Sequence, residues 1–147
     1  MFKHILVPTD GSALSTDTVS KAVEFAREIN ARITFFYAKP EYPVSFYGEG
    51  ALIDPTTPEK FAELADEQAQ TLLSAAESHA NTREVPSFRM AVTSDVPYQA
   101  IIAAASQAGC DLIFMASHGR RGISGLLLGS ETQKVLTHST IPVLVYR

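Results

Sequence analysis

The sequence predicts an α/β protein built around one open, parallel β-sheet. Short apolar segments alternate along the chain with longer segments whose apolar residues recur every three or four positions, as in helices with one buried face. This β-α-β-α-β-α-β-α-β alternation is typical of a five-stranded parallel sheet with helices on both faces. The chain has 147 residues, a common domain size, and no repeat or Gly/Ser-rich linker divides it. We therefore expect a single domain over residues 1–147.

The first two thirds of the chain are expected to contribute three strands, with the first helix between the first two. Residues 5–7 form an apolar strand that stops at Pro8 and at the turn residues 10–12. The second strand, 33–38, is rich in aromatic and β-branched residues, whereas the third, 88–92, has a weaker pattern. The first helix is expected to bury Val19, Ala22, Val23, Ala26 and Ile29.

A long second helix and a third helix follow from capping residues and apolar spacing. The second is expected to start with Thr57 as its cap and Pro58 in the first helical position, and to run to about Ala80. The third is expected to begin near residues 95–97. The second helix should bury Phe61, Leu64, Ala65, Leu72 and Ala76, and the third should bury Ala100, Ile101, Ala104 and Ala105.

The last third of the chain completes the pattern with two strands and a short helix. Residues 112–116 are continuously apolar, which favours a strand buried on both faces. Ser130 with Gln133 three residues later fits a capping box that opens the fourth helix. Residues 142–146 form the last strand.

Composition narrows the class of protein. No apolar run reaches the roughly 18–20 residues that a membrane-spanning helix needs. Twelve Lys and Arg residues against sixteen Asp and Glu residues give a net charge of −4, which does not favour nucleic-acid binding. The single cysteine, Cys110, has no partner for an internal disulfide, and we expect a buried, inert thiol. The four histidines show no metal-ligand spacing. We expect a cytoplasmic domain.

Two polar loops are expected to meet where the first and fourth strands end. In open α/β sheets, ligands bind outside the carboxyl ends of the strands, at the point where the strand order reverses. Residues 9–12 follow the first strand and residues 116–119 follow the fourth. If these strands are neighbours across the reversal, both loops line the same crevice.

The segment 116–130 has the composition of a phosphate cradle. It contains four glycines and two arginines before a helix start, and such backbone lets N–H groups approach an anion closely. An ordinary surface loop whose Ser130 only caps its helix is the alternative. The segment is not a Walker A loop because it lacks the lysine of that motif, and no GxGxxG follows the first strand.

Four segments together resemble the universal stress protein family: 3–12, 117–122, 128–130 and 141–145. Their order and spacing match from one end of the chain to the other. The ATP-binding branch of that family carries Gly, two residues, Gly, nine residues and then Gly-Ser or Gly-Thr. Gly119, Gly129 and Ser130 match this motif, whereas Ala116 stands in place of its first glycine. The resemblance implies an adenine-nucleotide α-hydrolase-like, Rossmann-like fold with strand order 3-2-1-4-5.

The resemblance also implies which residues bind the nucleotide. Asp10 is expected to contact the adenosine part, although its ordinary role is an Asx turn or a helix cap. Pro8 and Thr9 would flank the base, the backbone of Ala38 would meet adenine, and Met115 would line the opposite wall. The full implied set is Pro8, Thr9, Asp10, Ala38, Met115, Ala116, Gly119, Arg120, Gly129, Ser130 and Glu131.

We expect a small stress-response protein that binds ATP, with or without magnesium, or else ADP or AMP. No general base or catalytic lysine is placed for phosphoryl transfer, so any hydrolysis should be slow. A serine hydrolase using His118 is disfavoured because no GxSxG is present. The main alternative is a nucleotide-free homodimeric interaction module of the same fold. A flavin-binding domain is a weaker one, since Asp10 would repel a phosphate.

A homodimer through the last strand is expected from its composition. Residues Ile141–Tyr146 are apolar or aromatic apart from Pro142, and an unprotected sheet edge favours pairing with a second copy. The family dimerises in a similar way. The long connection 39–56 contains three aromatic residues, and it is expected to cover the crevice or to contact a partner. The sequence leaves both roles open.

Overall fold

A five-stranded parallel sheet forms the centre of the computed structural model of the chain, which describes residues 1–43, 56–119 and 127–147. Its strands lie in the order β3-β2-β1-β4-β5, which confirms the order that the resemblance implied. Their bounds are β1 (His4–Pro8), β2 (Arg32–Lys39), β3 (Ser87–Thr93), β4 (Leu112–Ala116) and β5 (Val143–Tyr146).

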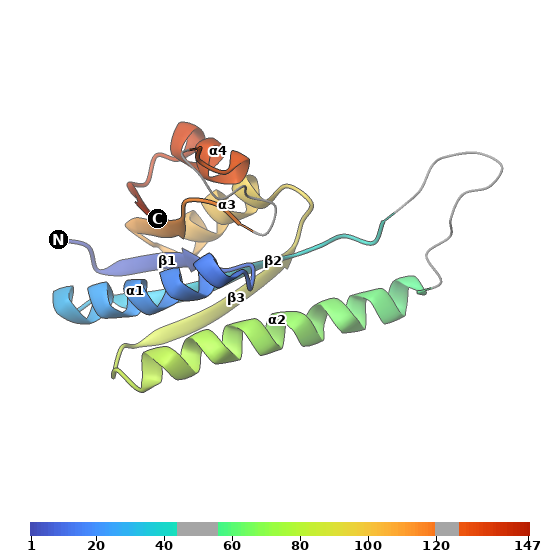
Figure 1. Cartoon of the computed structure of the whole chain (residues 1–147), viewed down its shortest axis with the longest axis horizontal. Helices are drawn as coiled ribbons and strands as arrows, with labels where there is room; N and C mark the ends of the chain where they lie inside the picture. The colour runs from blue at the N-terminus through green and yellow to red at the C-terminus, as the bar shows by residue number, and fades with distance from the viewer. Residues whose placement is uncertain (44–55, 120–126) are drawn as a thin grey trace.

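Four helices cover the two faces of the sheet (Figure 1). Helices α1 (Ala13–Ile29) and α2 (Pro58–Asn81) pack on one face, and α3 (Pro97–Ala108) and α4 (Ser130–His138) on the other. The alternation predicted from the sequence is therefore confirmed. Within the part of the chain that the structure describes, no helix is both long and apolar enough to cross a membrane.

The sheet separates two apolar cores, and β4 contributes to both. Leu112 and Phe114 belong to the core under α1 and α2, whereas Ile113 and Met115 belong to the core under α3 and α4. This alternation confirms the prediction that residues 112–116 are buried on both faces. Cys110 is buried in the second core, as expected.

The amino-terminal half of α2 extends beyond the sheet (Figure 1). The predicted buried face was therefore partly wrong, because Leu64 is 47% exposed and Phe61 is only half-buried. The periodic pattern identified the helix correctly, but only its second half has sheet to pack against. The residues that the helix buries are Ala69, Leu73, Ala76 and Ala80.

The helix starts show one prediction confirmed and one corrected. Thr57 caps α2 and its Oγ1 accepts the N–H of Lys60 at 3.1 Å, as predicted. The capping box predicted at Ser130 is wrong, because Gly129 is the cap residue, with φ −61° and ψ 150°, and Ser130 is the first helical residue. Gln133 instead donates from Nε2 to the carbonyl of Leu128 at 3.3 Å.

Candidate functional site

The carboxyl ends of β1 and β4 lie side by side at the centre of the sheet. β1 pairs with β2 on one side and with β4 on the other, so the strand order reverses at β1. Ile5 is opposite Leu112 and Leu6 is opposite Ile113, so the loops that follow these strands leave the same edge of the sheet. The predicted meeting of the two polar loops at the reversal point is confirmed, and this is where ligands bind in open α/β sheets.

Hydroxyl groups fix the turn between β1 and α1. The N–H of Thr9 donates to the carbonyl of Phe36 at 2.9 Å, and the Thr9 side chain is buried. Ser15 Oγ donates to Thr9 Oγ1 at 2.8 Å and accepts the N–H of Asp10 at 3.1 Å. Ser12 caps α1, because its Oγ accepts the N–H of Ser15 at 3.2 Å. These hydrogen bonds, all between residues of the protein itself, hold the turn in place.

The Asp10 carboxylate lies between the two loops. Its Oδ1 accepts the N–H of Ser12 at 2.9 Å, which is the Asx turn considered as its alternative role. Gly11 between them has φ 78°, a left-handed conformation that glycine adopts at little cost. The Oδ2 atom of Asp10 lies against Gly119, so a Cβ at position 119 would require the Asp10 side chain to shift.

Gly129 packs directly on the backbone that follows β4. Its N–H donates to the carbonyl of Ser117 at 2.7 Å. A Cβ at this position would lie 3.1 Å from His118 Cα and 3.3 Å from the Ser117 carbonyl oxygen, both parts of the backbone. Glycine therefore allows the start of α4 to approach the end of β4 closely. Ser130, the next residue, is exposed at the first position of α4.

Glu131 joins α4 to α3. Its Oε2 accepts the N–H of Tyr98 at 2.8 Å, in the first turn of α3, where the cap residue Val96 supplies no side-chain bond. Its Oε1 lies 3.4 Å from Lys134 Nζ. The carboxylate expected beside the nucleotide is thus engaged in fixing two helices relative to each other.

The other expected site residues lie along three neighbouring strands. Pro8 ends β1 opposite Phe36, and Ala38 lies two residues further along β2. Met115 is buried in the core under α3 and α4. Ala116 ends β4 opposite Tyr146. Arg120 lies outside the described residues, as do residues 44–55 of the long connection.

Two hydroxyl residues that hold these loops were missed by the sequence reasoning. Ser15 bonds to the β1 turn, and Thr132 Oγ1 donates to the carbonyl of Ala116 at 3.0 Å. Each lies in the first turn of a helix and is buried. One sequence signal was available for both residues. It is a Ser or Thr two or three residues after the cap of a helix that follows a strand.

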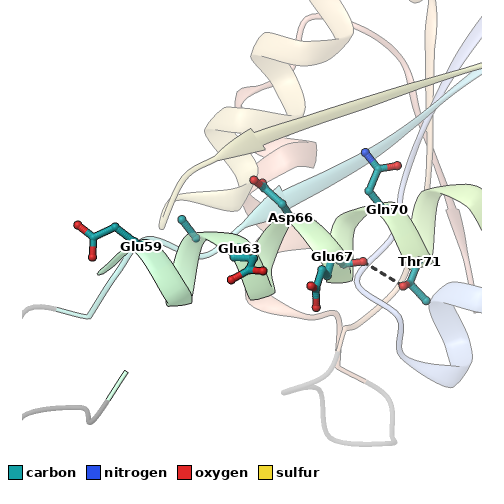
Figure 2. A pocket seen from close by; sticks show the side chains of 7 residues that line it. Glu59, Glu63, Asp66, Glu67, Gln70 and Thr71 are labelled. Carbon is teal, nitrogen blue, oxygen red and sulfur yellow. Dashed lines mark hydrogen bonds between the residues drawn. The ribbon is translucent and has the colours of Figure 1, made fainter. Parts of the chain in front are cut away.

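A surface hollow lies elsewhere, along α2 (Figure 2). Its lining comes from this one helix and includes Glu59, Glu63, Asp66 and Glu67. Carboxylates of this number repel a phosphate, so this hollow is not a candidate nucleotide site. Among the residues that the structure describes, no group of three or more His, Cys, Asp or Glu is placed to hold a metal ion.

The fold and the two glycines at the reversal point agree with the comparison against protein families. The model of the universal stress protein family matches residues 1–147, so the chain belongs to this family. It is 30% identical to universal stress protein MJ0531 of Methanocaldococcus jannaschii, over 100% of this chain and 83% of that protein. It is 31% identical to universal stress protein A homolog 1 of Coxiella burnetii, over 97% of this chain and 94% of that protein.

Solved structures share the fold. Protein MJ0577, a universal stress protein of Methanocaldococcus jannaschii, matches with a TM-score of 0.77 at 25% identity, over 99% of this chain and 95% of its own. A universal stress protein in complex with cAMP, one from Archaeoglobus fulgidus with dAMP and one from Arabidopsis thaliana with AMP have TM-scores of 0.71, 0.69 and 0.67. Their identities to this chain are 24%, 18% and 16%. These three matches cover at least 97% of this chain and at least 90% of theirs.

Proposed function

We propose that this universal stress protein, acting as one domain over residues 1–147, binds ATP or a related adenine nucleotide in the crevice between the ends of β1 and β4. The observation that carries the proposal is the packing of Gly119 and Gly129. A Cβ at position 129 would lie 3.1 Å from the His118 backbone, and a Cβ at position 119 would require the Asp10 side chain to shift. Both glycines follow β4 at the reversal point, where Gly119 lies against Asp10. Family members bound to cAMP, dAMP and AMP support an adenine nucleotide as the ligand class.

The proposed contacts follow the order of the loops. Asp10 accepts hydrogen bonds from the adenosine part, while Pro8, Thr9, the Ala38 backbone and Met115 surround the base. The phosphates lie at Gly129 and Ser130, where the first N–H groups of α4 have no partner within the helix and favour an anion. Ala116, Gly119, Arg120 and Glu131 complete the proposed set. Hydrolysis is slow or absent in this proposal, because no residue of the set acts as a general base.

Ligand-induced stabilisation tests the proposal. A nucleotide that binds only the folded state adds about 2.7 kcal/mol at a hundred times its dissociation constant. Millimolar Mg-ATP should therefore raise the melting temperature by several degrees, with ADP and AMP tested in parallel. The absence of any shift with all three nucleotides would favour the nucleotide-free interaction module instead.

Two serine variants locate the phosphate end of the site. Ser130→Ala removes an exposed hydroxyl at the start of α4 and should reduce the shift. Ser106→Ala removes an equally exposed helical hydroxyl from the last turns of α3 and should leave the shift unchanged. Equal shifts for both variants and the wild type would place the phosphates away from Ser130.

We also propose that the protein forms a homodimer through β5. This strand is an edge of the sheet, and its residues are half-buried and apolar or aromatic. An antiparallel pairing of two copies about a two-fold axis would join their sheets, and two-fold dimers are the commonest closed assembly of small proteins.

A further inference from the structure

Thr132 lies in the first turn of α4 with its side chain 3% exposed. Its Oγ1 donates to the carbonyl of Ala116 at 3.0 Å. Ala116 is the last residue of β4, so this bond joins the start of α4 to the point at which the chain leaves the sheet. Ala116 lies at the proposed nucleotide site and replaces the first glycine of the motif that the resemblance implied.

Two further bonds hold the same turn of α4. The N–H of Gly129 donates to the carbonyl of Ser117 at 2.7 Å, one residue beyond Ala116. Glu131 Oε2 accepts the N–H of Tyr98 from α3 at 2.8 Å. The first turn of α4 is therefore fixed on one side to the end of β4 and on the other side to the start of α3.

The position of this turn decides where an anion is held. The first N–H groups of a helix lack intrahelical partners and point toward a bound anion, so moving the turn moves the donors. Gly129 is held at the Ser117 backbone, and a Cβ added at this position would lie only 3.1 Å from His118 Cα. The turn therefore has little freedom to move toward the end of β4. The bond from Thr132 to Ala116 is a second connection between this turn and the end of β4, and it depends on a single hydroxyl.

We propose that Thr132 is a positioning residue for nucleotide binding: its hydroxyl, through Ala116, holds the α4 N–H groups at the distance from β4 that the phosphates require. This inference rests on the proposed function. It assigns Thr132 no contact with the ligand. A displacement of about 1 Å in a binding element can cost up to about a hundredfold in the step it supports, so loss of this tether should be measurable.

The test compares three variants by nucleotide affinity and by amide hydrogen exchange. Thr132→Val keeps the shape and removes the hydroxyl, and Thr132→Ser restores a hydroxyl. Thr34→Val is the matched control, since Thr34 is 2% exposed and its Oγ1 lies 2.8 Å from His4 Nε2, near the opposite end of the strands. Titration calorimetry with ADP and ATP gives the dissociation constant, and exchange at the Gly129 amide reports the turn without any ligand.

Thr132→Val should weaken nucleotide binding about tenfold or more and speed exchange at the Gly129 amide. Thr132→Ser should restore most of the nucleotide affinity and most of the protection of the Gly129 amide. Thr34→Val should change neither the affinity nor the exchange rate, even if it lowers the melting temperature as much as Thr132→Val does. Unchanged exchange at Gly129 in Thr132→Val overturns the tether, whatever the wild type binds. Faster exchange with unchanged affinity overturns the positioning role. A wild-type protein that binds none of the nucleotides contradicts the proposed function, and the exchange result then still decides the tether.

Discussion

The His4 imidazole is buried at the amino end of β1, with 5% of its surface exposed. Its Nε2 lies 2.8 Å from Thr34 Oγ1. Burial lowers the pKa of His4 below its usual 6.5, the charge of Arg32 lowers it further, and the charge of Asp111 raises it only in part. The folded protein therefore favours a neutral imidazole.

This histidine should make the fold sensitive to acid. In the unfolded chain His4 takes up a proton as the pH falls through about 6.5, whereas in the folded chain it stays neutral to lower pH. The unfolded state then binds more protons in this window. The free energy of unfolding should consequently fall as the pH drops from about 6.5 to the pKa of the folded state. Above that window the histidine is neutral in both states and its contribution is constant.

We predict that His4→Phe flattens this part of the stability profile. Urea unfolding followed by circular dichroism between about pH 7.5 and about pH 5 should show a smaller loss for the variant than for the wild type. His138→Gln, which removes an exposed histidine, is the control and should keep the wild-type slope. Parallel profiles for His4→Phe and the wild type would show that His4 is not the group responsible.

At the scale of single residues, sequence reasoning located some of the crevice and missed the bonds that shape it. The motif spacing pointed to Gly119 and Gly129, and the structure brings both to the reversal point with Asp10. Thr132 was missed because its partner, Ala116, lies 16 positions away. The place of Thr132 after the helix cap can mark the residue, but its partner depends on how the strand and the helix pack.

At the scale of the elements, α2 is unevenly buried along its 24 residues. Leu73 lies over the sheet and is 4% exposed, whereas Leu64 lies in the half that extends beyond the sheet and is 47% exposed. Because both residues lie within one helix, replacing either leucine by alanine changes helix propensity by a similar amount. The difference between the two losses of stability therefore reports the contribution of packing.

We predict that Leu73→Ala lowers the free energy of unfolding by about 2–4 kcal/mol, through lost burial and a residual cavity. Leu64→Ala should cost less than about 1 kcal/mol, since alanine is a good helix former and little buried surface is lost. Chemical denaturation of the two variants gives both values. Similar losses at the two sites would mean that the extended half of α2 is covered in solution.

The same helix shows why local features were predicted better than packing. Thr57 and Pro58 specify the start of α2 through their own chemistry, so that start was predicted correctly. The buried face was only partly right, because the sequence of the helix does not tell where the neighbouring sheet ends. The predicted cap at Ser130 failed for a related reason. Gly129 is held in extended conformation by its bond to Ser117, a residue outside the helix.

At the scale of the whole molecule, β5 leaves one side of its backbone open in the described structure. The carbonyl of Pro142, just before β5, accepts the N–H of Ile113 on β4, and the carbonyl of Tyr146 accepts the N–H of Ser117, just after β4. Backbone groups alternate in direction along a strand, so the N–H and carbonyl of Val145 point to the open side. They are available for a second copy of the strand.

We predict that Val145→Pro converts a homodimer into a monomer. The substitution removes an outward donor and leaves the bonds to β4 in place, as proline is tolerated on an edge strand. Light scattering should give twice the chain mass of 15.9 kDa for the wild type and a single chain mass for the variant. Val145→Thr keeps the donor and the branched side chain, so it should remain dimeric. A monomeric wild type, or a dimeric Val145→Pro, would contradict pairing through β5.

The whole-molecule arrangement was predictable only in part from the residues. The alternation of apolar and amphipathic segments predicts a parallel sheet with helices on both faces, but it is compatible with more than one strand order. The order 3-2-1-4-5 came from the resemblance to the family, and the structure has this order. Strand order depends on which strands meet across the sheet, and the apolar segments here are too alike to specify that alone.

The central position of β1 has a consequence for biosynthesis. The N–H of His4 donates a hydrogen bond to Asp111, 107 positions away. β1 therefore cannot pair with β4 until most of the chain has left the ribosome. Until then the open edge of β1 carries Ile5, Leu6 and Val7, all fully buried in the finished molecule. Exposed apolar strand edges promote association between chains. Chains that end early, at a stalled ribosome or a premature stop codon, therefore lack half of the crevice and are the form of this protein most prone to aggregate.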